Sequence, residues 1–202
     1  MPRKSLIRTN TCPYHVTIRT NNKEWFDIPM PIVWSFCMKS INYANLHHPV
    51  EIQSFVLMSN HYHLMIWTPN SDLDKFMFFF NSHLSKLIRK YTGRINRIFG
   101  DRYKWSLIKD QKYYLNVLRY IYQNPLRKDL SSLCEEYEFS SLYHYINNQN
   151  LGFKLKDPIY GDKTSFLKWV NLEDKKATDQ TRQSLQKPVY KPIVNQSSRR
   201  IL

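Results

Sequence analysis

Hydrophobic and polar positions follow a strand-like alternation in several short stretches of this chain. "PYHVTIRT" (13–20) is rich in β-branched and aromatic residues and predicts a strand that ends at the polar stretch "NNKEW". "EIQSFVLM" and "HYHLMIWT" predict two more strands, joined by a short turn at Ser59 and Asn60. A fourth, short strand is expected at about 105–108, after the basic loop "DRYK".

Helical spacing of apolar residues predicts three helices between and after these strands. The first opens near Pro29 and ends at the "HHP" break. The second takes Ser71 as its N-cap and ends in Lys and Arg before Gly93. The third is "DQKYYLNVLRYIYQNP" (110–125), which Pro125 terminates. The resulting β-α-β-β-α-β-α order predicts an α+β fold. We expect a ferredoxin-like (RRM-like) antiparallel sheet with packed helices and an extra C-terminal helix.

The composition of the chain changes after about residue 150. We therefore expect one domain over 1–150 and a basic C-terminal extension over 151–202 that is partly flexible. Residues 175–202 carry seven basic residues, one acidic residue and few apolar side chains, which predicts a flexible tail.

Composition narrows the possible partners. Thirty Lys and Arg against sixteen Asp and Glu give a formal charge of +14, which favours a polyanion such as nucleic acid. The apolar runs are too short to span a bilayer and the N-terminus has no signal-like core, so we expect no membrane partner. Three cysteines without CxxC spacing suit reduced thiols. A cytoplasmic protein, bacterial and associated with the nucleoid, is expected.

Two histidines interrupt the third strand. Because side chains alternate across a strand, His61 and His63 project to one face and Tyr62 projects to the other. Two imidazoles held in this way can share a metal ion. Two ordinary histidines on a half-exposed strand are the alternative, so the pair needs a third ligand from elsewhere.

The third helix offers candidates for that ligand. Tyr114, Leu118, Ile121 and Tyr122 define its core face. Tyr113, Tyr120 and Asn124 follow a stripe along its edge, where Tyr120 and Asn124 stack one turn apart. This places a phenol and a carboxamide at the border of the sheet. The alternative is that Tyr120 is an edge tyrosine with its hydroxyl in water.

These stretches together resemble a known family of enzymes. In chain order, these are "YHVTIR", "NHYHLMI", "RYIYQNPLRKDL" and "EEYEFSSLYHY", and together they look like the motifs of the single-tyrosine transposases of the HUH (His-hydrophobic-His) nuclease superfamily. Among these, they are most similar to the REP-associated tyrosine transposases. The resemblance covers roughly residues 12–146.

The resemblance implies a role for each candidate. His61 and His63 correspond to the metal-binding pair, Asn124 to the polar residue that completes the metal site, and Tyr120 to the nucleophile. It implies a divalent metal ion, Mg²⁺ or Mn²⁺, as cofactor. It also implies a single-stranded DNA endonuclease and strand-transferase that acts through a 5′-phosphotyrosine intermediate. The expected substrate is single-stranded DNA beside a hairpin, and the expected state is a monomer or a homodimer.

A basic cluster is the expected nucleic-acid-binding surface. It interleaves aromatic residues, which suits contact with phosphates and stacking with unpaired bases. A solvated basic face over core aromatics is the alternative for each single residue. The candidates are Lys86, Arg89, Lys90, Arg94, Arg97, Arg102 and Lys104, together with Arg119, Arg127 and Lys128 near the proposed site.

Two other functions stay open at this point. One is a non-enzymatic module that binds single-stranded or hairpin nucleic acid on the same sheet surface. The other is a metal-dependent hydrolase in which water attacks the phosphate. The second predicts that Tyr120→Phe stays active, whereas the transposase hypothesis predicts loss of cleavage.

Overall fold

A computed structural model describes residues 5–191. The elements of the first 122 residues follow the predicted order, and further helices come after them. The bounds are β1 Tyr14–Arg19, α1 Met30–His47, β2 Glu51–Met58, β3 His61–Trp67, α2 Leu73–Thr92, β4 Lys104–Leu107, α3 Gln111–Tyr122, α4 Ser141–Ile146, α5 Lys163–Asn171 and α6 Lys175–Ser184. The strands form one antiparallel sheet in the order β2-β3-β1-β4. The predicted α+β, ferredoxin-like fold is confirmed.

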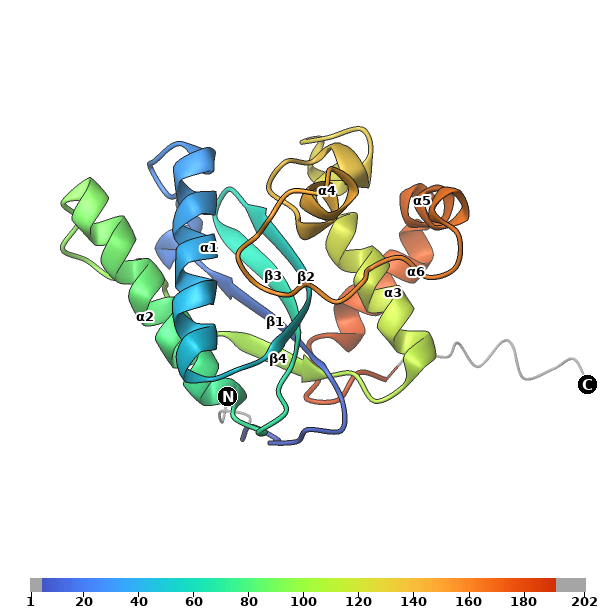
Figure 1. Cartoon of the computed structure of the whole chain (residues 1–202), viewed down its shortest axis with the longest axis horizontal. Coiled ribbons are helices and arrows are strands. Elements are labelled where there is room, and N and C mark those ends of the chain that lie inside the picture. The colour runs from blue at the N-terminus through green and yellow to red at the C-terminus, as the bar shows by residue number, and fades with distance from the viewer. Residues whose placement is uncertain (1–4, 192–202) are drawn as a thin grey trace, which may run out of the picture.

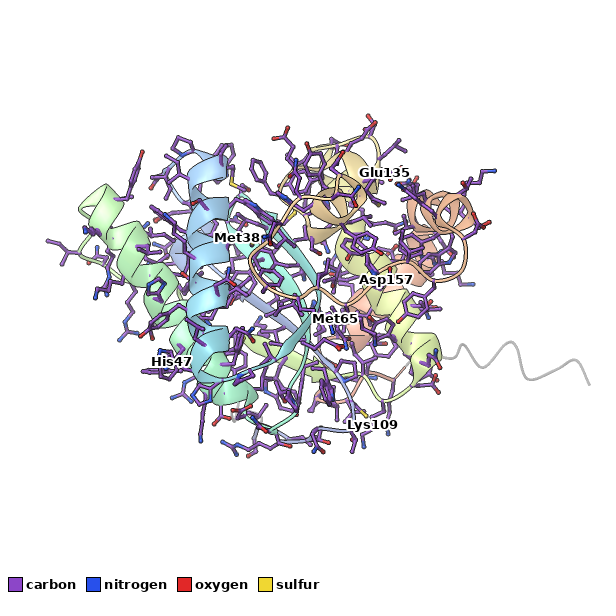
Figure 2. The ribbon with its side chains drawn as sticks, viewed as in Figure 1. Met38, His47, Met65, Lys109, Glu135 and Asp157 are labelled. Atoms are coloured by element: carbon purple, nitrogen blue, oxygen red, sulfur yellow. The ribbon has the colours of Figure 1, made fainter. Side chains whose placement is uncertain are left out.

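Helices cover both faces of this sheet. Figure 1 shows α1 and α2 on one side, and α3 with α4, α5 and α6 on the other. The α1–α2 side holds an apolar core that includes Val16, Tyr62 and Leu64. The α3 side holds a second core, in which Met65, labelled in Figure 2, packs with residues of α3 such as Leu118. The two cores follow from the alternation of side chains along β1 and β3.

Chain segments from outside the sheet hydrogen-bond to both of its edges. On the β2 edge, Leu57 N donates to Phe139 O at 2.9 Å, and Lys156 N donates to Ile52 O at 2.8 Å. On the β4 edge, Leu107 N donates to Pro188 O at 2.8 Å. Tyr190 N returns a bond to Leu107 O at 2.9 Å. The backbone groups of both edge strands are therefore partly satisfied within the chain.

Two local predictions need correction. Residue Ser71 is not the cap of α2, because its backbone is left-handed (φ 56°) and the N-cap position belongs to Asp72. The flexible tail predicted from residue 175 is wrong for the described part. Residues 175–184 form α6, which Asp174 caps and which buries Thr181 and Ser184. The remainder, 192–202, lies outside the described residues, and the domain boundary near residue 150 stays a prediction.

No helix within residues 5–191 is long and apolar enough to cross a membrane.

Candidate active site

The histidine pair lies on the α3 side of the sheet. The ring centroids of His61 and His63 are 5.1 Å apart, close enough for both side chains to reach one ion. The opposite face receives Tyr62, which is fully buried and donates to Asn81 Oδ1 at 2.7 Å. The predicted alternation along β3 therefore holds residue by residue.

Asn60 fixes the tautomer of His61. The amide of Asn60 donates to Lys23 O at 2.7 Å, so its oxygen faces His61 Nδ1, 2.8 Å away. An amide oxygen only accepts, so His61 Nδ1 carries the proton and Nε2 keeps its lone pair. Burial, with Arg19 and Lys128 nearby, lowers the pKa of His61 to about 4. The ring is therefore neutral at neutral pH and presents a free nitrogen.

His63 is oriented by a third histidine that the sequence analysis did not single out. His15 Nε2 lies 2.9 Å from His63 Nδ1, and the two rings stack with centroids 5.2 Å apart. Burial lowers the pKa of His15 to about 3. The pKa of His63 is also lowered well below its usual value by burial and by neighbouring imidazoles and arginines. When His63 Nδ1 donates to His15, the Nε2 lone pair of His63 is free to bind an ion.

His15 could have been found from the alternation in β1. His15, Thr17 and Arg19 share a face, and Thr17 pairs with His63 across the sheet. The sequence shows this alternation but not the register that places His15 beside His63.

Tyr120 of α3 stands over the histidines. Its ring centroid is 5.8 Å from that of His63 and 6.3 Å from that of His15, both edge-on. Burial raises the pKa of Tyr120, while the positive charges of Arg127, Arg182 and Arg19 act in the opposite direction. A phenol is therefore held beside neutral imidazoles and three cations.

Asn124 turns its amide nitrogen back onto the helix. Its Nδ2 donates to Tyr120 O at 2.9 Å and to Ile121 O at 3.3 Å. Both partners are carbonyl oxygens, so the nitrogen must face them and the amide oxygen is left for another ligand. Asn124 and the histidine pair line the same groove.

The chemistry of these residues fits a divalent ion. No group of three His, Cys, Asp or Glu side chains within residues 5–191 is placed to hold a metal. A site here would instead use two neutral imidazoles and one carboxamide oxygen, namely His61, His63 and Asn124. Mixed nitrogen and oxygen donors suit Mn²⁺ and are tolerated by Mg²⁺.

The groove has a volume of about 2570 Å³ and receives most of the predicted cations. Six of the ten candidates line it: Arg89, Arg97, Arg102, Lys104, Arg127 and Lys128. The other four, Lys86, Lys90, Arg94 and Arg119, are not among its lining residues. Arg94 pairs with Glu24 at 2.7 Å, and the Arg119 guanidinium lies 5.3 Å from the centroid of the Trp169 ring. Four further basic residues, which the sequence did not single out, also line the groove: Arg8, Arg19, Lys23 and Arg182.

Comparison with known proteins identifies the family. A family model described as "Transposase IS200 like" matches residues 8–124, more than half of the chain. The chain belongs to this transposase family. The matched segment includes His15, His61, His63, Tyr120 and Asn124, whereas α4, α5 and α6 lie beyond it. A search of curated proteins finds no match to this transposase.

A solved structure has the same fold as the transposase. It is described as a REP-associated tyrosine transposase bound to a REP hairpin. Its match has a TM-score of 0.60 at 16% identity and covers 80% of this chain and 95% of that chain. The resemblance stated from the sequence motifs is thereby confirmed for the family and the fold.

Proposed function

We propose that this transposase cuts and rejoins single-stranded DNA, with Tyr120 as nucleophile and a divalent ion held by His61, His63 and Asn124. The observation that carries the proposal is the position of the Tyr120 ring, edge-on to His63 at 5.8 Å in the groove. A tyrosine on an ordinary amphipathic helix has no need of buried, neutral histidines beneath it.

The ion would act as a Lewis acid that polarises the scissile phosphate and helps to orient it. The two imidazoles and the carboxamide would leave its positive charge uncompensated. Asn60 and His15 would hold the two imidazoles in the tautomers that binding requires.

Arg127 would contact both the scissile phosphate and Tyr120. Its guanidinium carbon lies 4.5 Å from the centroid of the Tyr120 ring, and Nη2 donates to Tyr120 O at 2.8 Å. Nη1 is buried and has no hydrogen-bond partner among residues 5–191. An arginine N–H without a partner beside the nucleophile suits a phosphate oxygen.

The reaction would proceed by attack of the Tyr120 oxygen on the phosphorus. A tyrosine–phosphorus bond forms and the bond from phosphorus to the 3′-oxygen breaks. The phenol loses its proton and the departing 3′-oxygen gains one. The 5′-phosphotyrosine keeps the energy of the broken bond, so a 3′-hydroxyl can reverse the step without ATP.

The charge of the groove supports a nucleic-acid substrate. The related REP-associated transposase is described as bound to a REP hairpin, which supports single-stranded DNA with a hairpin as the substrate here. With one candidate nucleophile per chain, strand exchange would take two copies in a homodimer or two cycles of a monomer. Both states, and an association with the bacterial nucleoid, stay predictions.

The test uses the full chain with Mn²⁺ and end-labelled single-stranded DNA that carries hairpins from the flanks of its own gene. We expect a covalent protein–DNA adduct on a denaturing gel, and we expect Tyr120→Phe to abolish it. Tyr113→Phe is the matched control, because Tyr113 lies on the same helix and contacts the Tyr190 ring. It should keep the adduct.

Other outcomes would replace the proposal. Cleavage that persists in Tyr120→Phe without an adduct would show that water is the nucleophile. Binding of these DNAs without cleavage or adduct, with and without metal, would favour the non-enzymatic module.

A further inference from the structure

The loop between β1 and α1 is unusually constrained. Three of its non-glycine residues have left-handed backbones: Asn22 (φ 52°), Lys23 (φ 60°) and Asp27 (φ 57°). Side chains with a Cβ rarely adopt this region, and such residues persist only where surrounding contacts fix them. Three such residues in one loop indicate that the surrounding contacts hold its backbone in one conformation.

Hydrogen bonds to the turn before His61 fix one side of this loop. Thr20 N donates to Asn60 O at 2.9 Å, and Phe26 N donates to Ser59 O at 3.3 Å. Asn60 also binds Lys23 O through its amide and His61 through its oxygen. The side chain of Phe26 is buried in the core. The loop is therefore anchored on both sides of Trp25, directly beside the histidine pair.

The segment before β4 holds the loop from the other side. Asn21 N donates to Ile98 O at 2.8 Å, and Glu24 pairs with Arg94 at 2.7 Å. Gly100 allows this approach, because a Cβ at that position would lie 3.1 Å from the Asn21 Cα. The two loops thus form one fixed wall of the groove that leads to His61.

Trp25 is exposed on this fixed loop. Its side chain is 71% exposed, although its neighbour Phe26 is buried. Asn22 and Lys23 line the groove, as do Arg97 and Arg102 of the opposing loop. Trp25 is not itself a lining residue of the groove. A large exposed aromatic ring that the core does not use, two positions from the groove-lining Lys23, has the composition of a stacking platform for unpaired bases.

We propose that Trp25 stacks on an unpaired base of the DNA strand next to the scissile phosphate, while Lys23 binds the adjoining backbone. The inference deepens the proposed function, and it takes its substrate class from that function. Duplex DNA would gain little from Trp25, because its bases expose no free face along the helix. The loop would bring the strand to His61 through its attachment to Asn60.

Binding of an oligothymidylate of about 20 nucleotides tests this subsite, since that length exceeds the roughly 4–16 nucleotides that one OB fold, another single-strand-binding fold, covers. Fluorescence anisotropy, without divalent metal and at physiological salt, would measure the affinity. We expect Trp25→Ala to bind about 5- to 100-fold more weakly and Trp25→Phe to stay within about threefold of the unmodified chain. Leu46→Ala, which truncates an 83% exposed apolar residue on α1, should bind as the unmodified chain does. Affinity for a blunt duplex should be unchanged in all variants.

Two results would overturn the inference. One is oligothymidylate binding by Trp25→Ala that equals that of the unmodified chain. The other is an equal loss of oligothymidylate and duplex binding, which would indicate a general change in charge or folding.

Photocrosslinking of the unmodified chain gives a second measurement that does not depend on how a variant folds. Oligothymidylates with a single 5-iodouracil at successive positions should crosslink to Trp25, as located by mass spectrometry, and absence of that product would contradict the inference. Neither experiment requires cleavage. If no phosphotyrosine adduct forms but Trp25 behaves as expected, the proposed reaction fails and the subsite stands. If the adduct forms but Trp25 has no effect, the reverse holds.

Discussion

The two faces of β1 and β3 are built differently although helices cover both. Toward α1 and α2, these strands present only buried side chains that pack in the core, such as Val16, Ile18 and Leu64. Toward α3 they present His15 and His63, which are just 3% and 6% exposed. Burying a polar ring is costly unless its nitrogens find partners. The α1–α2 face therefore serves folding, whereas the α3 face accepts a cost in stability that a binding site explains.

Adjacent residues on β3 separate these roles most sharply. We expect Leu64→Ala to lower the free energy of unfolding by about 2–5 kcal/mol, because it opens a cavity in the apolar core. His63→Ala removes one of the three proposed metal ligands, and we expect metal-dependent adduct formation to fall by at least about 100-fold. Denaturant unfolding and the adduct assay measure the two effects.

The comparison of these variants is made below the melting temperature of Leu64→Ala. Under that condition Leu64→Ala should form the adduct at close to the normal rate. Equal activity losses in the two variants would show that the faces are not functionally distinct.

The neighbouring pair on β1 refines the contrast. His15→Phe keeps a ring of similar shape but removes the acceptor for His63 Nδ1. We expect Mn²⁺ affinity to fall by about 10- to 100-fold, as for other residues that orient a metal ligand. Calorimetric titration with Mn²⁺ measures the change.

Tyr14→Phe is the control on the other face. The Tyr14 hydroxyl donates to Ile7 O at 2.7 Å, so its loss should cost about 1 kcal/mol of stability and leave Mn²⁺ affinity unchanged. Normal Mn²⁺ binding by His15→Phe would mean that His15 is only a packing residue.

Arg127 lies beside the Tyr120 ring on the α3 side, and Arg127→Lys tests whether the geometry of its guanidinium matters. Lysine keeps the charge but cannot span the Tyr120 carbonyl and a phosphate with a planar fork. We expect the rate of adduct formation to fall by about 10-fold, the worth of one charge-assisted hydrogen bond. Arg119→Lys, whose guanidinium packs on Trp169, should keep the normal rate. Equal rates for both variants would reduce Arg127 to a source of charge.

The sequence predicted the elements that follow simple periodicity. Alternation located the strands, and helical spacing with Pro and Gly boundaries located α1, α2 and α3. Helical spacing placed Tyr120 and Asn124 one turn apart on the edge of the third helix; Tyr120 lies on α3, whereas α3 ends at Tyr122 and Asn124 lies in the turn that follows it. These features depend on contacts between near neighbours, which a single sequence reveals.

The missed features depend on contacts between distant segments or on local signals masked by composition. His15 and His63 are 48 positions apart, and only the register of β1 on β3 joins them. The sequence analysis predicted neither α5 nor α6, and in α6 polar and charged residues occupy every position except Ala177. Yet α5 carries a usable signal, since Asp162 caps it and Phe166 and Val170 are buried four positions apart.

The smallest expected effect separates cations inside the groove from cations outside it. Arg97 lines the groove, whereas Lys90 is exposed at the end of α2 and does not. Each phosphate contact with a single strand contributes about 0.7 to the slope of log affinity against log salt. Arg97→Gln should therefore reduce the magnitude of that slope for oligothymidylate by about 0.7. Lys90→Gln should leave it unchanged, because a cation that touches no phosphate releases no counterion. Equal slopes for the two variants would mean that the strand follows the net charge of the protein rather than the groove.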